Sequence, residues 1–169
     1  MSLTNFVLSW NVRGVGKFEK KVAIRKLVGL KKPSVIFLQE TKLRNADVSI
    51  VSVLCGRQTS FKDALRPSNG LSRGLITLWE EGFFKSDSMV IRPSFICVCG
   101  KLMESKLKCL LINIYAPNDT DKREEIFEEI LGVVYASDFP ILMGGDFNVV
   151  RTTDEKKDGF QYSSYGKIL

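Results

Sequence analysis

Two kinds of hydrophobic pattern alternate along the first part of the chain. Residues 6–10 and 35–38 are short runs rich in β-branched and aromatic side chains, and each run predicts a strand. The second run is apolar throughout, which is typical of a strand buried on both faces. Between the two runs, residues 18–31 predict a helix, because one helical face carries Ile24, Leu27, Val28 and Lys31.

The remainder of the chain predicts more strands and one further helix. A loop at 67–70 precedes a strand at 75–79, and strand candidates at 89–99 and 107–115 have no helix between them, which favours antiparallel pairing. A helix is expected from Asp119 or Thr120 to about Tyr135, with an apolar stripe made by Phe127, Ile130, Leu131 and Val134. A strand at 139–143 runs directly into the Gly-Gly-Asp sequence at 144–146, and residues 151–169 contain no clear element. Mixed strands with helices outside them predict an α/β sandwich.

The composition limits the chemistry that the chain can perform. Its 169 residues, of which 44% are hydrophobic and 26% charged, fit one globular domain, which we place at 1–169. The chain contains no histidine, which excludes a Ser-His-Asp triad, a His-liganded zinc site and a histidine general base. The four cysteines form no CxxC pair and are expected to be buried, reduced thiols. No apolar stretch is long enough to span a membrane and no signal peptide is evident, so we expect an intracellular protein without membrane contact.

Positive charge is concentrated in the first quarter of the chain. Residues 1–45 contain ten Lys and Arg and two acidic residues, which gives a charge of +8. The other residues contain 15 Lys and Arg and 17 acidic residues, which gives a charge of −2. On the helix predicted at 18–31, Lys17, Lys21 and Arg25 follow one another at intervals of four on one face. Such a distribution suits binding to a phosphate backbone, and it equally suits a solvated Lys-rich helix face.

Polar side chains follow four of the predicted strands at the point where each strand ends. They are Asn11, Glu40, Tyr115, and Asp146 with Asn148. If the sheet brings these ends together, two carboxylates, two amides and a phenol share one cleft. Oxygen ligands of this kind suit Mg²⁺, which proteins hold with one or two carboxylates together with the phosphates of the substrate. The glycines at 144 and 145 would allow backbone or substrate to approach closely.

Each of these residues also has a purely structural interpretation. Asn11 could cap a turn, Tyr115 could be a half-buried strand aromatic, and the sequence from Asp146 to Asn148 could form an Asx turn. Glu40 could form an ion pair with a nearby Lys or Arg. The recurrence of such residues at strand ends favours the functional interpretation.

Four motifs, in the same order and with the same spacing, give the chain a resemblance to a known family. They are SWNVRG, LQETK, NIYAPND and GGDFNVV. Together they resemble the endonuclease/exonuclease/phosphatase family, which has a DNase I-like fold. The nearer resemblance is to the apurinic-type endonuclease domain of plant non-LTR (LINE-type) retrotransposons, which the stretch NGLSRGLITLW also resembles. Members of that subgroup usually have a small residue at the position of Arg73, and no role for this arginine follows from the sequence.

The resemblance implies a four-layer α/β sandwich of two mixed sheets flanked by helices, and Mg²⁺-dependent hydrolysis of phosphate esters, with Mn²⁺ as an alternative metal. Glu40 would bind the metal with Asn11 beside it, and Tyr115 would contact the phosphate. Asp146 would orient or activate the nucleophile, and Asn148 would support the transition state.

The resemblance also implies the partners of the site. DNA would be the substrate, with a reverse transcriptase domain in the same polyprotein, and the protein would be nuclear. Arg13 and the basic helix face would lie near enough to touch a nucleic acid backbone.

The chain departs from the family at its end. The family continues with further strands and a closing motif that bears an Asp and a His, whereas this sequence contains no histidine. We therefore expect the last strands to be missing and these 169 residues to be inactive alone. Two alternatives to a DNA endonuclease remain: a non-catalytic remnant that retains nucleic-acid binding, and a family member that acts on another phosphate ester.

Overall fold

The first of two β-sheets carries two helices on its outer face. The computed structural model describes residues 6–44, 50–56, 60–69 and 73–149. In chain order, the elements of this half are β1 (Val7–Asn11), α1 (Phe18–Lys31), β2 (Val35–Gln39), α2 (Ile50–Cys55), β3 (Phe61–Arg66) and β4 (Leu75–Glu80). The strand order across the sheet is β1-β2-β4-β3, with β1 and β2 parallel and the other pairs antiparallel.

The second sheet follows in the chain and carries one helix. Its elements are β5 (Phe84–Ile91), β6 (Phe95–Leu102), β7 (Lys108–Tyr115), α3 (Thr120–Tyr135) and β8 (Ile141–Asp146). The strand order is β5-β6-β7-β8, with antiparallel pairs except for the parallel pair of β7 and β8. At the start of α3, the side chain of Asp119 accepts a hydrogen bond from the backbone N–H of Lys122 at 3.0 Å, which caps the helix.

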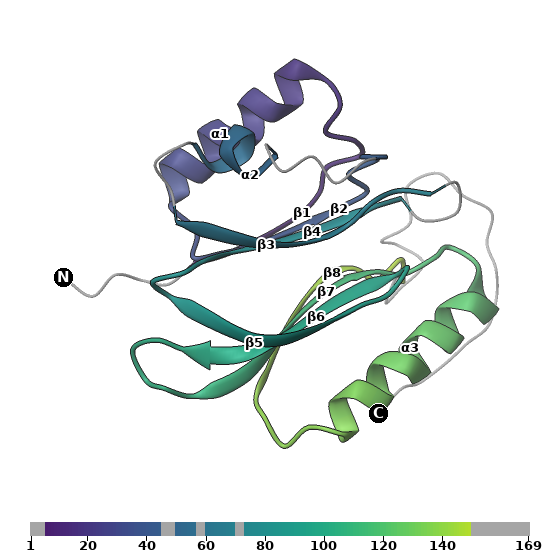
Figure 1. Ribbon diagram of the computed structural model, residues 1–169. Helices are drawn as coiled ribbons and strands as arrows, with labels where there is room; N and C mark the ends of the chain where they lie inside the picture. The colour runs from purple at the N-terminus through teal and green to yellow at the C-terminus, as the bar shows by residue number, and fades with distance from the viewer. Residues whose placement is uncertain (1–5, 45–49, 57–59, 70–72, 150–169) are drawn as a thin grey trace.

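The two sheets face each other, and the helices cover their outer faces, so the molecule has four layers (Figure 1). Three apolar clusters lie between the layers. On β2, Ile36 and Leu38 pack toward α1 and α2, whereas Val35 and Phe37 pack between the sheets. On β7, Ile112 packs toward α3. The predicted α/β sandwich with two mixed sheets is confirmed, and the burial of both faces explains the continuous apolar run at 35–38.

A polar cluster lies within the apolar layer between the sheets. The Asn113 side chain on β7 donates to the carbonyl oxygen of Ile76 at 2.9 Å and to the hydroxyl of Thr77 at 3.2 Å, both on β4. It also accepts a hydrogen bond at 2.8 Å from the amide nitrogen of Gln39 on β2. Asn113, Gln39 and Thr77 are almost fully buried, so these bonds satisfy groups that have no access to water and join the two sheets.

Several sequence predictions of secondary structure need correction. The strand candidate at 89–99 is wrong: it spans the end of β5, a turn at 92–94 and the first part of β6, because Pro93 has no N–H and the chain reverses there. The strand predicted at 139–143 begins later, at Ile141, and continues through the two glycines to Asp146. The elements α2 and β3 were not predicted.

The helix positions are confirmed, with one correction to their apolar faces. The predicted ranges of α1 and α3 agree with the structure. Leu131, which was assigned to the apolar stripe of α3, is 45% exposed, whereas Ile126 and Val133 pack toward the sheet instead. Cys97 and Cys109 are buried free thiols, and Cys55 and Cys99 are only half-buried. No helix among the described residues is both long and apolar enough to cross a membrane.

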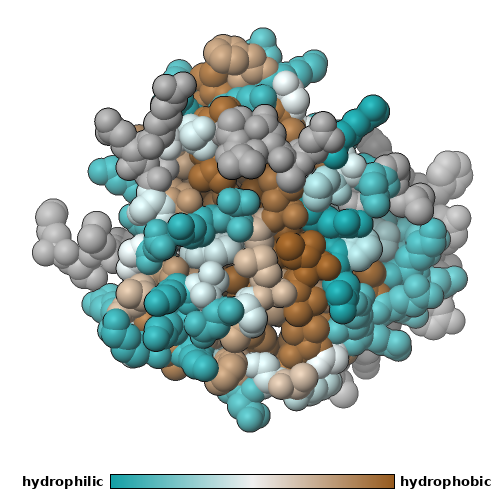
Figure 2. Space-filling model, in the orientation of Figure 1, coloured by the Kyte–Doolittle hydropathy of each residue, from teal (hydrophilic) through white to brown (hydrophobic). Residues whose placement is uncertain are grey.

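Apolar side chains also reach the surface of the molecule. Figure 2 shows a band of hydrophobic residues on one face, with hydrophilic residues on both sides of it. The exposed large apolar side chains include Met89, Val90 and Ile91 on β5, and Leu142 and Met143 on β8. β5 and β8 are the edge strands of their sheet, so these side chains have a neighbouring strand on one side only.

Candidate active site

The carboxyl ends of β1, β2, β7 and β8 lie at one rim of the sandwich. β1 is parallel to β2 and β7 is parallel to β8, and the two pairs face each other across the interior. Backbone hydrogen bonds fix the segments that leave these strands. The N–H of Gly14 donates to the carbonyl oxygen of Glu40 at 2.6 Å, and the N–H of Ala116 donates to the carbonyl oxygen of Asp146 at 2.8 Å. The predicted convergence of strand ends is therefore present.

Asn11 links the two carboxylates of the rim. Its side-chain nitrogen donates to Oε1 of Glu40 at 3.1 Å and to Oδ2 of Asp146 at 2.7 Å. Its side-chain oxygen accepts from the backbone N–H of Arg13 at 3.1 Å. The carboxylates of Glu40 and Asp146, which are 29 and 135 residues from Asn11 along the chain, are thus held on either side of one amide group. In this arrangement Asn11 orients the carboxylates, and Glu40 and Asp146 are the oxygen donors available to a cation.

Among the described residues, three side chains donate hydrogen bonds to Glu40. Besides Asn11, the Tyr115 hydroxyl donates to Oε1 at 3.1 Å and the Arg73 guanidinium donates to Oε2 at 3.1 Å. Burial of the carboxyl raises its pKa, but the bonds from Asn11 and Arg73, the charge of Arg73 and the bond from Tyr115 outweigh it, so the pKa lies below its ordinary value of 4.5. Glu40 is therefore ionised at neutral pH.

Tyr115 lies between the carboxylates and the arginine. The guanidinium carbon of Arg73 is 5.9 Å from the centre of the Tyr115 ring, within the range of a cation–π contact. Burial and the adjacent charge of Glu40 raise the pKa of the Tyr115 phenol above 10, so the phenol keeps its proton at neutral pH and can donate a hydrogen bond.

Asn148 is fixed next to Asp146 by local bonds. Its backbone N–H donates to Oδ1 of Asp146 at 3.1 Å, and its side-chain nitrogen donates to the carbonyl oxygen of Ala116 at 2.5 Å. The amide nitrogen carries a second hydrogen, which is available to a ligand. Asp146 is thus held by Asn11 and by the backbone of Asn148, and the structure brings together all five residues predicted for the cleft.

The rim contains backbone strain that the sequence did not predict. Arg13, Glu40, Lys42 and Asn148 all have positive φ angles, between 48° and 55°. A left-handed conformation costs roughly 1 kcal/mol or more for a residue other than glycine, and such residues cluster at functional sites. Gly145 has a φ of 150°, and a Cβ there would overlap the carbonyl oxygen of Ile114. The close approach predicted at this glycine is therefore made by the backbone of Ile114.

A cavity opens beside Asn11 and Asp146. It has a volume of about 620 Å³, and its lining includes Asn11, Asp146 and Asn148 together with Ser9, Gln39 and Asn118. Ser9, Gln39 and Asn118 were not predicted as site residues, although all three lie within or beside the motifs quoted above. Arg73 was also missed, because its contact with Glu40 joins positions 33 residues apart and no periodicity reveals it.

The structural interpretations of these residues are also realised. Asn11 closes a turn onto Arg13, Asp146 forms an Asx turn with Asn148, Tyr115 is half-buried, and Glu40 has an ion-pair partner. These local roles do not account for the contacts among Asn11, Glu40, Tyr115 and Asp146, which come from three different strands and the end of a fourth. The local bonds hold each side chain in place, and the cross-strand bonds assemble the cluster.

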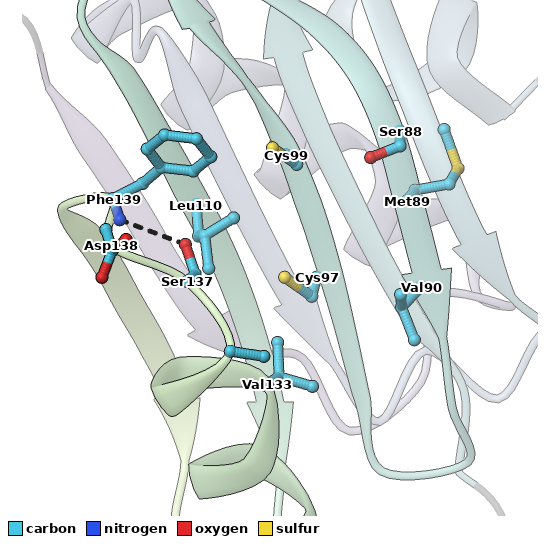
Figure 3. A pocket seen from close by; sticks show the side chains of 11 residues that line it. Ser88, Met89, Val90, Cys97, Cys99, Leu110, Val133, Ser137, Asp138 and Phe139 are labelled. Carbon is cyan, nitrogen blue, oxygen red and sulfur yellow. Dashed lines mark hydrogen bonds between the residues drawn. The ribbon is translucent and has the colours of Figure 1, made fainter.

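A second cavity lies on the outer side of the second sheet, beside the end of α3. It has a volume of about 360 Å³, and Figure 3 shows Cys97 and Cys99 on β6 with Leu110, Val133 and Phe139 around it. Burial and the neighbouring Cys99 raise the pKa of the Cys97 thiol to about 11, so this sulfur is protonated at neutral pH and is a poor nucleophile. The mostly apolar lining carries no arrangement of charged groups comparable to the rim.

The basic residues predicted to bind nucleic acid lie on α1 and before it. Arg13, Lys17 and Arg25 are exposed, and Lys21 is half-buried. Because β1 and β2 are parallel, α1 starts near the rim and runs back along the sheet away from it. Lys17 at the start of α1 is thus close to the rim, whereas Arg25 lies about 12 Å further along the helix axis.

The assembled cluster can be compared with known proteins. A model of the Endonuclease/Exonuclease/phosphatase family matches residues 8–163. The chain belongs to this family. No curated protein matched the chain in a sequence comparison. The family match spans every residue of the cluster.

Solved structures of this family's fold are similar to the chain at low sequence identity. The AP endonuclease LMAP from Leishmania major has a TM-score of 0.67 and 16% identity, and the match covers 91% of this chain and 58% of that one. The human Nocturnin catalytic domain with bound sulfate has a TM-score of 0.63 and 15% identity, and the match covers 86% of this chain and 64% of that domain. TDP2 from D. rerio, complexed with a single-strand DNA product, has a TM-score of 0.61 and 17% identity, covering 85% and 60%. These matches establish the fold, and this chain spans less than two thirds of each of those chains.

The donor set of the rim fits a hard divalent cation. Within the described residues, no three Cys, Asp or Glu side chains are grouped closely enough to form a cage for a metal. Mg²⁺ does not need such a cage, because one or two carboxylates with water and phosphate oxygens suffice. Glu40 and Asp146, held around Asn11, provide those oxygens, and Asp146 lines an open cavity.

Proposed function

We propose that the chain carries a Mg²⁺-dependent endonuclease site that hydrolyses phosphodiester bonds in DNA, of the kind found in LINE-type retrotransposons. The observation that carries this proposal is the bridge of Asn11 between the carboxylates of Glu40 and Asp146, with Asn11 and Asp146 lining a cavity of about 620 Å³. Mn²⁺ is the alternative metal. Membership of the family and the DNA product in the TDP2 structure support a nucleic acid substrate.

The residues of the rim have distinct roles in this proposal. A divalent metal, when held by Glu40, supplies charge withdrawal from a phosphoryl oxygen. Asp146, whose two oxygens are fixed by separate donors, orients the attacking water through its remaining lone pairs. The protonated Tyr115 phenol and the second amide hydrogen of Asn148 donate to the oxygens where negative charge develops.

The full activity is proposed for a longer protein. Because the chain spans less than two thirds of the similar solved structures, we infer that further strands complete the fold and the site. A reverse transcriptase domain in the same polyprotein and a nuclear location are predictions from the resemblance to retrotransposon endonucleases.

A plasmid-nicking assay tests the proposed activity. Supercoiled DNA is incubated with this chain, and with a chain extended past Leu169, in Mg²⁺ or in EDTA. We expect the extended protein to nick in Mg²⁺ only and Asp146→Ala to abolish nicking. The matched control is Asp138→Ala, because Asp138 is exposed and precedes the opposite end of β8. Nicking by Asp146→Ala at the rate of the unchanged protein would contradict the proposal.

One observation favours a non-catalytic alternative. The ion pair of Arg73 with Glu40 places a resident positive charge on the proposed metal ligand, as expected of a remnant that keeps only its nucleic-acid binding. The same assay separates the two functions. A remnant would retard DNA in a gel, and neither this chain nor the extended chain would nick it. Hydrolysis of a small phosphate ester without nicking of DNA would indicate a different substrate.

A further inference from the structure

Arg73 is held beside Glu40 by its backbone as well as by its side chain. The carbonyl oxygen of Arg73 accepts from the N–H of Lys42 at 2.8 Å, and that of Gly74 accepts from the N–H of Thr41 at 3.2 Å. The segment that carries Arg73 thus pairs with the residues that directly follow Glu40. This backbone pairing places the Arg73 guanidinium beside the Glu40 carboxylate.

The arginine covers a particular oxygen of the carboxylate. Oε1 of Glu40 accepts from Asn11 and Tyr115, whereas the one side-chain partner of Oε2 among the described residues is Arg73, at 3.1 Å. The Glu40 side chain is 10% exposed and that of Arg73 is 49% exposed, so the guanidinium lies on the solvent side of the pair. A cation that approaches Oε2 from solvent meets Arg73 first.

A guanidinium and a divalent cation cannot share this oxygen without strong repulsion, because like charges at contact distance repel even in a partly hydrated site. The Arg73 side chain is 49% exposed, and its guanidinium also contacts the Tyr115 ring, at 5.9 Å from the ring centre. The ion pair that displacement of Arg73 would break is partly exposed, and such pairs contribute little to stability. The arrangement therefore allows exchange of one cation for another at Glu40.

We propose that Arg73 is a resident counter-ion of Glu40 that competes with the divalent metal, so that metal binding requires displacement of the guanidinium and is weaker than the carboxylates alone would give. This inference rests on the proposed function, which places the metal at Glu40. Arg73 is a positioning residue in this role: it sets the metal concentration at which the site fills.

The test is Mn²⁺ binding, measured by the electron paramagnetic resonance signal of free Mn²⁺ with this chain, and it requires no activity. Removal of the competing charge in Arg73→Gln should tighten Mn²⁺ binding about tenfold, from the loss of the ion pair and of the repulsion. Arg73→Lys keeps the charge and should bind within about threefold of the unchanged chain. The matched control is Arg92→Gln, since Arg92 is 51% exposed, pairs with Glu129 at 2.7 Å, and lies in the turn after β5, which β6 separates from β7. Its affinity should stay within about twofold.

The outcomes separate the competition from the metal site itself. Glu40→Gln should abolish the tight binding. If Glu40→Gln abolishes binding but Arg73→Gln binds no more tightly than the unchanged chain, the competition is overturned and the proposed metal site stands. Equal tightening in Arg73→Gln and Arg73→Lys also overturns it, because the effect would not depend on charge. If no variant shows binding that depends on Glu40, both the competition and the metal site are overturned. Near-ultraviolet circular dichroism confirms that each variant is folded.

Discussion

Replacement of Asn11 by leucine tests how the carboxylates of the rim are held together. The change keeps the approximate size of the side chain and removes the amide that donates to Glu40 at 3.1 Å and to Asp146 at 2.7 Å. Hydrogen bonds to charged groups contribute about 1.5–3 kcal/mol each. Asn11 and Asp146 are only half-buried, so we expect a lower total for the two bonds, about 2 kcal/mol of unfolding free energy at pH 7.5.

The pH dependence of this loss identifies its cause. In the unchanged chain the folded pKa of Glu40 lies below its ordinary value of 4.5, so its stabilising contribution is present above that value and is lost as the pH falls through the folded pKa. The bond from Asn11 is one cause of the lowering, so Asn11→Leu raises the folded pKa. The cost of the substitution should therefore be smaller at pH 3.5 than at pH 7.5, because it is lost as the pH falls through the folded pKa of Glu40.

The assay is urea unfolding followed by the fluorescence of the two tryptophans, Trp10, which is half-buried, and Trp79, which is buried. Asn113→Leu is the matched control. Its partners are the neutral Gln39 amide, the Ile76 carbonyl and the Thr77 hydroxyl, so its expected loss of about 1–3 kcal/mol should be the same at both pH values. An equal loss for Asn11→Leu at pH 3.5 and 7.5 would refute the assignment of Asn11 as a donor to the ionised Glu40 carboxylate.

Three further changes test other parts of the molecule. Gly145→Ala should destabilise the fold by about 3 kcal/mol or more, since it adds a Cβ against backbone at a positive φ; thermal unfolding measures it, and a loss below about 1 kcal/mol would contradict the close packing. Asp119→Ala should cost about 1 kcal/mol in urea unfolding through loss of the α3 cap, and no change would mean that the cap is not formed in solution. Charge reversal of Lys17, Lys21 and Arg25 should weaken DNA binding and flatten its salt dependence; an unchanged salt slope in a titration would remove these residues from the interface.

The sequence predicted those elements whose pattern is local. The helices α1 and α3 follow from helical periodicity, and Asp119 marks the start of α3 as an N-cap. The converging rim followed from polar residues at the ends of apolar strands. These predictions succeeded because burial on both faces leaves few alternatives for runs such as that at 35–38.

The elements that failed depend on tertiary contacts. β3 contains Lys62 and Asp63 and has no clean alternation of burial, so its strand conformation comes from pairing with β4. The turn after β5 was missed because the three turn residues at 92–94 lie between two apolar runs, at 89–91 and 95–99. Likewise, nothing in the sequence near Arg73 indicates that it meets Glu40, because only the pairing of two loops brings them together.

The central claim is that Glu40 and Asp146 act in one hydrolytic site, and a double-mutant cycle tests it most directly. Single-turnover nicking of supercoiled DNA in saturating Mg²⁺ is measured for the extended protein, Glu40→Gln, Asp146→Asn and the double variant. Residues that act as a unit have strongly non-additive effects on rate. We predict that each single change removes nearly all Mg²⁺-dependent nicking and that the double variant is no slower than the slower single one. Near-normal nicking by either single variant, or losses that multiply in the double variant, would contradict a shared site.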